Sequence, residues 1–194
     1  MDYLLKKFLP RIEFDSYEDF KANYKVNVPE NFNFGFDVVD AWAEEEPEKK
    51  ALVWCDEEDN EKIFTFTDIK RLSNKAANFF KSLGVKKGSV VMLILRRRWE
   101  YWVCAVALCK LGATIIPATL QLTKKDIVYR GNAAQVCAVV CVNDPFVIEQ
   151  VEAAQPDIPS LQNKILVAEQ REGWLDLNEE LEKFPDTFPR PTGQ

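Results

Sequence analysis

The 194-residue sequence contains no histidine and only seven glycines. The absence of histidine excludes Ser-His-Asp and Cys-His catalysis, histidine-ligated metal centres and an imidazole pH switch. No two glycines are separated by a single residue, and no glycine precedes Lys-Ser or Lys-Thr. The dinucleotide fingerprint G-x-G-x-x-G and the phosphate loop G-x-x-x-x-G-K-[ST] are therefore both missing. An enzyme of nucleotides or acyl groups would need a phosphate loop from elsewhere.

The charge balance is acidic, with 31 acidic and 25 basic side chains. An acidic chain is a poor partner for nucleic acid, which selects basic surfaces. No apolar run approaches the roughly 20 residues that a membrane span needs. The apolar stretch within residues 1–11 is too short and too charged to act as a signal peptide. We expect a cytoplasmic location, no membrane span and no nucleic-acid partner.

The chain has an odd number of cysteines and no C-x-x-C pair. This pattern fits neither a zinc knuckle nor a redox pair, and acidic clusters such as 44–46 lie in turns with nothing to orient them. We therefore expect no metal site. Each cysteine lies in an apolar run, which indicates free thiols that act as small buried hydrophobic side chains. The five are Cys55, Cys104, Cys109, Cys137 and Cys141.

The first part of the chain predicts three short helices and a hairpin. The helices are expected over residues 1–9, 16–24 and 36–45. The hairpin is expected to pair residues 51–55 with residues 62–66 across an acidic turn.

From Thr67 onward, strands alternate with helices. Thr67 is expected to cap a helix that ends at Gly84. The expected strands are 90–95, 113–117, 136–142 and 164–167, and the helices between them are 99–111, 124–132 and one that begins at Asp144-Pro145. Thr123 and Asp126 form a capping-box pattern at one of these helices. This order predicts an α/β fold with a largely parallel sheet and helices on both faces.

Arg96, Arg97 and Arg98 directly follow a predicted buried strand. In open α/β sheets, ligands bind beyond the carboxyl ends of the strands, where three guanidinium groups could meet a phosphate or a carboxylate. The alternative is a solvated turn with ordinary ion pairs. An aromatic cluster follows at 99–102, and it either packs in the core or walls an apolar pocket. These roles stay open, and the residues alone define no catalytic set.

Three segments from Phe64 onward resemble the N-terminal part of the adenylate-forming acyl-CoA synthetases. They read Phe64-Thr65-Phe66-Thr67, Leu83-Gly84-Val85-Lys86-Lys87-Gly88-Ser89 and Leu111-Gly112-Ala113, with the apolar strand 90–95 between the last two. In that family the corresponding glycines end helices and allow a tight entry into a strand.

Two further segments resemble the medium-chain branch of this family. Residues 117–130 read P-A-T-L-Q-L-T-K-K-D-I-V-Y-R, and residues 32–43 read F-N-F-G-F-D-V-V-D-A-W-A. The likeness spans about residues 30–142. The chain departs from the branch at Trp99, where relatives often have proline, and at Ser89, where aspartate is usual. The first departure places the substrate pocket in question.

The resemblance implies a two-step reaction in which a carboxylic acid, such as a fatty acid, attacks the α-phosphate of ATP. The resulting acyl-adenylate then passes its acyl group to the thiol of coenzyme A. Mg²⁺ and basic groups would offset charge at the phosphates. Gln121 matches the branch's glutamine near the coenzyme A channel, so its amide is a candidate to hydrogen-bond the pantetheine arm. Alternatively, Gln121 is a polar residue that flanks a helix.

The family's phosphate loop, adenine motif, ribose-binding aspartate and catalytic lysine lie downstream of the residues present. We therefore expect residues 1–184 to be an incomplete N-terminal portion of the AMP-binding large domain. Residues 185–194 are expected to be a proline-rich linker to the remainder. The isolated chain is predicted to be inactive, to hold no catalytic residue and to expose surface through which it could self-associate. The alternatives are a non-catalytic binding module with the same fold and a thiol-based redox sensor.

Overall fold

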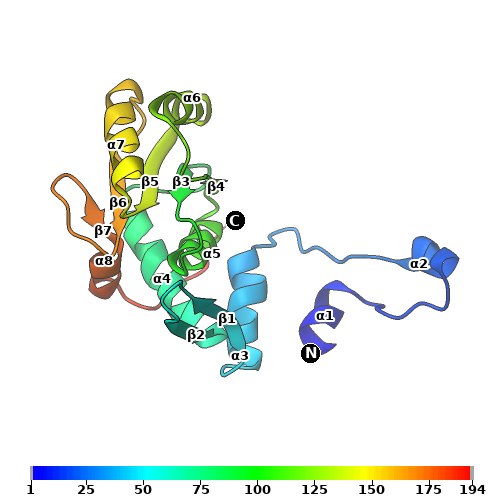
Figure 1. The fold of residues 1–194 in the computed structure, drawn as a ribbon. Helices are drawn as coiled ribbons and strands as arrows, with labels where there is room; N and C mark the ends of the chain where they lie inside the picture. Colours follow the sequence, from blue (N-terminus) through cyan, green and yellow to red (C-terminus); the bar gives the residue numbers. More distant parts are fainter. Residues whose placement is uncertain (1, 193–194) are drawn as a thin grey trace.

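The computed structural model describes residues 2–192 (Figure 1). The N-terminal elements are α1 (Asp2–Phe8), α2 (Tyr17–Asn23), the π-helix η1 (Gly35–Asp40), α3 (Ala41–Glu45), β1 (Lys50–Cys55) and β2 (Glu61–Thr65). They are followed by α4 (Phe66–Ser82), β3 (Val90–Ile94), α5 (Glu100–Leu111), β4 (Thr114–Pro117), α6 (Lys124–Ala134) and β5 (Val136–Val142). The last elements are α7 (Pro145–Ala154), the 3₁₀ helix η2 (Gln155–Asp157), β6 (Asn163–Val167), β7 (Leu175–Asp176) and α8 (Leu177–Lys183).

The main sheet has five strands in the order β4-β3-β5-β6-β7, and neighbouring strands pair in parallel throughout the described residues. A separate antiparallel hairpin pairs β1 with β2. Both features confirm the predicted α/β fold, its parallel sheet and its small hairpin. β4 closes one side of the sheet and β7 closes the other (Figure 1).

Strand β3 shows why helices cover both faces of the sheet. Successive side chains of a strand point to opposite faces. Val91 and Leu93 accordingly join one buried cluster, together with side chains of α4 and α5. Met92 and Ile94 join a second cluster, which is built with side chains of α6 and α7. A continuous apolar strand is what burial on both faces requires.

The N-cap of helix α4 lies two residues before the predicted cap. Thr65 is the N-cap: its hydroxyl oxygen accepts a hydrogen bond from the backbone N–H of Asp68 at 3.1 Å, and the Asp68 carboxylate accepts the Thr65 N–H at 2.9 Å. The expectation that Thr67 caps this helix is therefore wrong. Thr67 instead donates its hydroxyl to the carbonyl of Pro47 at 2.9 Å. The Thr-x-x-Asp spacing recognised at Thr123 also occurs here and favours Thr65.

The substitution Thr65→Ala is expected to lower the free energy of unfolding by about 1 kcal/mol, because it removes one side of the capping box. The control Thr67→Ala should cost about 0.5 kcal/mol or less, because it loses an exposed hydrogen bond but gains helix propensity. Urea unfolding followed by circular dichroism measures both. A larger cost at Thr67 than at Thr65 would contradict the assignment of the cap.

A buried ammonium group links α5 to α4 and η1. Lys110 is fully buried, and its Nζ donates to Asp40 Oδ1 at 2.7 Å, Ser73 Oγ at 3.0 Å and Asn74 Oδ1 at 2.6 Å. Burial lowers the pKa of Lys110 and raises the pKa of Asp40, against the attraction between the two charges. The sequence pattern predicted an ordinary helix over 36–45. The structure instead winds Gly35–Asp40 as a π-helix, from which Asp40 reaches Lys110.

The segment after α8 lies against α4. The side-chain amide of Asn74 donates to the carbonyl of Asp186 at 2.8 Å, and that of Asn78 donates to the carbonyls of Pro185 and Thr187 at 3.0 and 2.9 Å. Phe188 is buried in the core. These contacts describe the path of the chain here, and the boundary between a domain and a linker at 184/185 stays a prediction.

Candidate functional site

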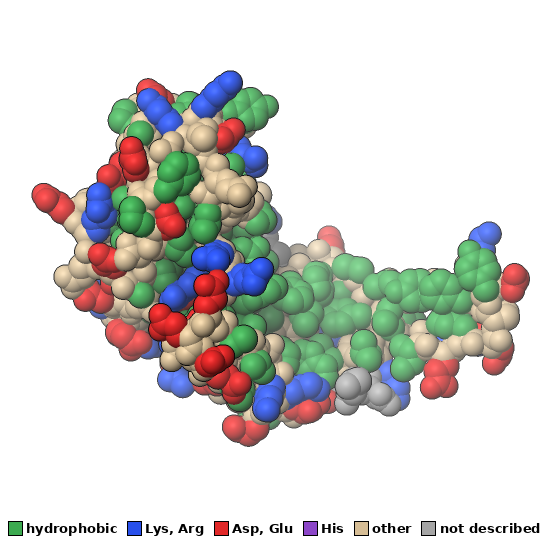
Figure 2. All heavy atoms as spheres, in the orientation of Figure 1, with side chains coloured by type: hydrophobic (Ala, Val, Ile, Leu, Met, Phe, Trp, Pro, Cys, Tyr) green, Lys and Arg blue, Asp and Glu red, His purple; other side chains and the backbone are tan. Residues whose placement is uncertain are grey.

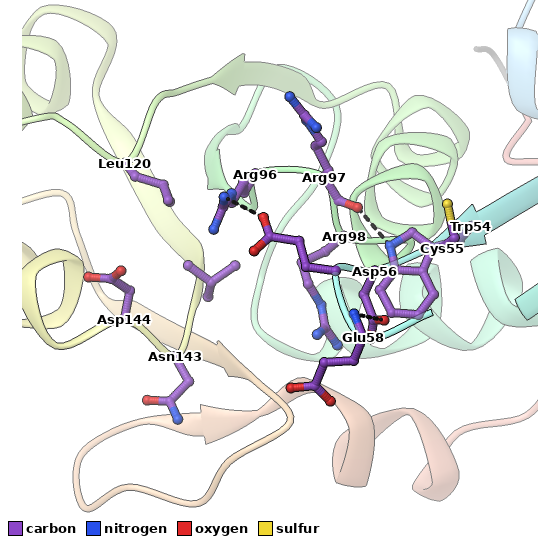
Figure 3. Close-up of a pocket in the computed structure, with 12 residues that line it drawn as sticks. Trp54, Cys55, Asp56, Glu58, Arg96, Arg97, Arg98, Leu120, Asn143 and Asp144 are labelled. Carbon is purple, nitrogen blue, oxygen red and sulfur yellow. Dashed lines mark hydrogen bonds and ion pairs between the residues drawn. The ribbon is translucent and has the colours of Figure 1, made fainter. Parts of the chain in front are cut away.

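A cleft of about 480 Å³ opens beyond the carboxyl ends of β3 and β5 (Figure 3). Residues 54–58, at the hairpin turn, form one wall, and residues 96–98 follow β3. Residues 142–144 come from the end of β5, and Leu120 comes from the loop after β4. The cleft therefore has the location at which open α/β sheets bind ligands. It contains all three arginines that the sequence singled out.

Arg96 turns the chain out of the sheet. Its backbone is left-handed, with φ of 48°, a conformation that costs a non-glycine residue about 1–2 kcal/mol. Such strain is concentrated at functional sites. The Arg96 guanidinium donates to Glu57 Oε1 of the hairpin turn at 3.1 Å (Figure 3). Both side chains are exposed, so the pair contributes little stability, but it bridges two walls of the cleft.

Arg98 forms an ion pair with a buried carboxylate. Its Nε and Nη2 donate to Glu100 Oε2 and Oε1 at 3.0 and 2.6 Å. The Glu100 side chain is 0% exposed, so it depends on this bidentate partner for charge compensation. The Arg98 guanidinium also lies 5.7 Å from the ring centre of Trp54. The guanidinium of Arg98 is therefore already occupied by contacts within the protein.

Arg97 differs from its two neighbours. Its backbone carbonyl accepts the indole N–H of Trp54 at 2.7 Å, which fixes the hairpin to the end of β3. Within residues 2–192, its guanidinium has no hydrogen bond or ion pair. In Figure 3 it points away from the Arg96–Glu57 pair. Two of the three arginines thus form the ordinary ion pairs of one interpretation, and a role of Arg97 toward an anionic ligand stays a prediction.

Two acidic residues of the cleft, Asp56 and Asp144, accept hydrogen bonds from nearby backbone N–H groups. Asp56 accepts the side-chain amide and the backbone N–H of Asn60 and the backbone N–H of Glu58, and these bonds hold the pKa of Asp56 below its usual value. Asp144 caps α7 by accepting the N–H groups of Phe146 and Val147. The part of the chain that the structure describes contains no group of three side chains suited to a metal ion.

The aromatic cluster lies outside the cleft. Trp99 is buried and packs on Phe64, with ring centres 5.1 Å apart, which agrees with the core-packing interpretation. Trp102 is 54% exposed and contacts Tyr101 edge-on. None of the three lines the cleft.

Gln121 lies in the loop that follows β4, next to the cleft residue Leu120. Its side chain is exposed, and its backbone N–H donates to the hydroxyl of Thr119 at 3.4 Å. The side chain is therefore open to solvent near the carboxyl end of β4. Its role toward coenzyme A stays a prediction.

Sequence reasoning missed the hairpin's contribution to the cleft. Trp54 forms a wall and holds the arginine turn, and Cys55 lies beside it. The expectation of buried thiols holds only for Cys104 and Cys141, since Cys109 and Cys137 are half-buried and Cys55, on β1, is exposed. The alternation of β1 explains this outcome, because a two-stranded hairpin covers only one face of each strand.

The cysteines are expected to react in a fixed order with iodoacetamide. Cys55 should be modified in the folded protein, because it is exposed. Burial raises the pKa of Cys141 to about 12 and that of Cys104 further, so both should react only after unfolding. Mass spectrometry of peptides after timed alkylation measures the order. Equal labelling of Cys104 and Cys55 in the native state would contradict it.

The fold has a counterpart among solved structures. The chain is similar to the crystal structure of the anthranilate CoA ligase AuaEII in complex with anthranoyl-AMP, with a TM-score of 0.71 and 20% identity. The match covers 84% of this chain and 30% of that chain. The architecture is therefore that of part of an adenylate-forming ligase.

Residues 39–192 match the family described as AMP-binding enzyme, and the chain belongs to this family. It is 35% identical over 181 residues to "Acyl-coenzyme A synthetase ACSM3, mitochondrial" of Pongo abelii and 34% identical to that of Homo sapiens, covering 90% of this chain and 30% of each relative. It is 37% identical over 162 residues to "Acyl-coenzyme A synthetase ACSM5, mitochondrial" of Rattus norvegicus, covering 80% of this chain and 28% of the relative. The chain thus spans about 30% of the length of these relatives. The resemblance to the medium-chain branch is confirmed.

Within residues 2–192, no helix has the length and apolar character required to cross a membrane.

Proposed function

We propose that this chain provides the N-terminal portion of the large domain of an ATP-dependent acyl-CoA synthetase. The complete enzyme converts a carboxylic acid to its acyl-adenylate and then to the coenzyme A thioester. The observation that carries the proposal is the family match over residues 39–192, with relatives named as acyl-coenzyme A synthetases. The cleft beyond the carboxyl ends of β3 and β5 supports it. Nothing in the structure favours the non-catalytic alternative.

The residues of this chain fit only some of the groups that the proposed reaction requires. The unpaired guanidinium of Arg97 fits a phosphate or carboxylate group. The exposed amide of Gln121 fits the amide-rich pantetheine arm of coenzyme A. The sequence holds no glycine-rich phosphate loop, and the described residues hold no metal-ligand cluster. The proposal therefore assigns the main ligands of the ATP triphosphate and of Mg²⁺ to the part of the relatives that this chain does not cover.

The isolated chain is accordingly proposed to be inactive. The test incubates the 194-residue chain with ATP, Mg²⁺, octanoate and labelled pyrophosphate, and measures exchange of the label into ATP. A polypeptide in which the chain is continued by the remainder of the human relative is assayed in parallel. We expect exchange in the second sample only. Exchange by the isolated chain would overturn the proposal that it is inactive on its own. An inactive but folded chimera would count against the synthetase function.

Gln121 provides a narrower test in the same chimera. The substitution Gln121→Ala should raise the KM for coenzyme A about tenfold, as expected for a lost hydrogen bond of about 1.4 kcal/mol, and leave the pyrophosphate exchange rate unchanged. Gln135→Ala, which removes an exposed amide that bonds the carbonyl of Asn132 at the end of α6, is the control for a lost surface hydrogen bond outside the cleft. An unchanged KM at Gln121 would assign this residue to the loop alone.

The location of the protein needs a separate test. The sequence predicted the cytoplasm, whereas the relatives are named mitochondrial. We propose that the protein shares the mitochondrial location of its relatives. Fractionation of cells that carry the protein with a C-terminal fluorescent tag distinguishes the two compartments.

A further inference from the structure

The ion pair between Arg96 and Glu57 joins two walls of the cleft and is weakly held (Figure 3). A single hydrogen bond connects the two side chains, from Arg96 Nη2 to Glu57 Oε1 at 3.1 Å. The side chain of Arg96 is 61% exposed, and that of Glu57 is 89% exposed. Such a pair contributes little stability, because water competes for both charges. Each side chain can therefore exchange its partner at a small cost in free energy.

The two segments that carry this ion pair are held in place by other contacts. The carboxylate of Asp56 accepts three hydrogen bonds within the hairpin turn, which fix the shape of that turn. The indole N–H of Trp54 donates to the carbonyl of Arg97 at 2.7 Å, which fastens the hairpin to the end of β3. The backbone of the cleft thus does not depend on the ion pair. Loss of the pair would free two side chains and leave the walls where they are.

The acidic side chains of the cleft differ in what they bind. Figure 2 shows basic and acidic side chains close together on this face of the molecule. Asp56 and Asp144 accept backbone N–H groups of their own segments. Glu58 also lines the cleft, and within residues 2–192 its carboxylate has no hydrogen bond or ion pair. Among the described residues, Glu57 is the one whose carboxylate occupies the guanidinium of Arg96.

We infer that Arg96 exchanges Glu57 for the phosphate group of a ligand in the cleft, so that Glu57 is an internal competitor of this ligand. The carboxylate of Glu57 occupies the place at the guanidinium that the ligand's anionic group takes. The left-handed backbone of Arg96, with φ of 48°, supports a functional role, because such strain is concentrated at functional sites. The inference rests on the geometry of the cleft and not on the proposed synthetase activity.

A phosphate monoester is the class of ligand that fits this exchange. A ligand with a carboxylate would replace Glu57 by the same chemical group and would gain no attraction at Arg96. A phosphate monoester carries about −1.5 to −2 charges at neutral pH and has three acceptor oxygens, so it binds a guanidinium more strongly. Leu120 and Val142 also line the cleft, and their apolar side chains suit the organic part of an ester.

The test titrates the isotope-labelled 194-residue chain with phenyl phosphate at constant ionic strength. Nuclear magnetic resonance of the backbone and arginine side chains gives the Kd and the residues that respond. Benzoate has the same ring with a carboxylate, and inorganic phosphate lacks the ring, so parallel titrations with both define the class of ligand.

Three variants test the exchange itself. Glu57→Gln removes the competitor, and Arg96→Gln removes the guanidinium that binds the ligand. Glu58→Gln is the matched control, because it removes one negative charge from the same turn without removing a bond to Arg96. Circular dichroism and urea unfolding verify that each variant is folded.

We expect phenyl phosphate to shift the resonances of residues 57 and 96. Glu57→Gln should bind it about three- to fivefold more tightly than the unchanged chain, because an exposed ion pair is a weak competitor. Glu58→Gln should change the Kd less than about twofold, because salt screens a charge that makes no contact. Arg96→Gln should raise the Kd about tenfold or more, because it removes a charge-assisted hydrogen bond. Benzoate and inorganic phosphate should both bind more weakly than phenyl phosphate.

Equal gains for Glu57→Gln and Glu58→Gln would overturn the inference, because they would reduce the effect to net charge. An unchanged Kd for Arg96→Gln, or no binding by the folded chain and its folded Glu57→Gln variant, would overturn it as well. Benzoate or inorganic phosphate that binds as tightly as phenyl phosphate would contradict the class of ligand. A Glu57→Gln variant that loses stability and gains no affinity would assign the ion pair to bracing the hairpin alone.

The outcome is separate from the pyrophosphate exchange assay. A chain that binds phenyl phosphate in this way, while the folded chimera stays inactive, keeps this inference and removes the proposed function. An active chimera together with an unchanged Kd for Arg96→Gln keeps the proposed function and removes this inference.

Discussion

The substitution Lys110→Met is expected to lower the free energy of unfolding by about 3–5 kcal/mol, because it leaves the carboxylate of Asp40 buried without its cation. Asp40 is 7% exposed, and its bond to the Lys110 ammonium is 2.7 Å long. The variant also removes a donor from Ser73 and Asn74. Urea unfolding at neutral pH measures the loss.

Two controls separate the buried charge from general effects. Lys124→Met removes a surface ion pair with Asp157, in which both side chains are about half exposed, and should cost less than about 1 kcal/mol. The double variant Lys110→Met with Asp40→Leu should regain most of the lost stability, because no unpaired charge remains. Equal costs for Lys110→Met and Lys124→Met would contradict the role of burial.

The Lys110→Met variant should also change how stability depends on pH. Burial already raises the pKa of Asp40, while Lys110 and Lys70 lower it and Glu44 raises it. Loss of the ammonium raises this pKa further. When the pKa of a carboxyl group is higher in the folded than in the unfolded state, the free energy of unfolding of the protein falls as the pH rises from the unfolded pKa through the folded pKa. The deficit of the variant should therefore narrow on acidification, as Asp40 becomes protonated in the folded state.

The central sheet could be predicted because its strands are buried on both faces. Six apolar residues in a row over 90–95, and seven over 136–142, leave little choice between strand and loop. β7 and α8 were not predicted, because β7 has two residues and its strand character comes only from pairing with β6. Helix α8 begins at Leu177, directly after its cap Asp176, but the acidic run that follows has few apolar residues to reveal a helical period.

The site could be predicted only as a location. The topology placed the three arginines at the carboxyl end of β3, and the structure confirms that they line a cleft. Which arginine remains unpaired depends on contacts between distant segments. Glu57 pairs with Arg96 across 39 positions, and Trp54 reaches Arg97 across 43. Likewise, the sequence of α5 shows a lysine near a helix end, where a basic residue is ordinary, and not its buried partners on α4 and η1.

Arg98→Gln is expected to destabilise the protein by about 3 kcal/mol, the lower end of the range for a broken buried ion pair, because Arg98 itself is 35% exposed. The cost arises at Glu100, whose side chain is 0% exposed and loses both of its hydrogen bonds from Arg98. Arg98→Lys keeps the positive charge but cannot donate from two fixed positions, so it should still cost about 1–2 kcal/mol. Urea unfolding of the three proteins measures this order.

The matched variant Arg97→Gln should leave stability within about 0.5 kcal/mol, because its guanidinium has no partner among residues 2–192. Its effect should instead appear in ligand binding. In the chimera with the human relative, we expect Arg97→Gln to lower the affinity for coenzyme A or for ATP about tenfold. This factor corresponds to the loss of one charge-assisted contact of about 1.4 kcal/mol. A stability loss at Arg97 as large as at Arg98 would show that the two arginines share one structural role. An unchanged affinity for both ligands would remove Arg97 from the binding site, while the ion pair of Arg98 with Glu100 would remain a feature of the fold.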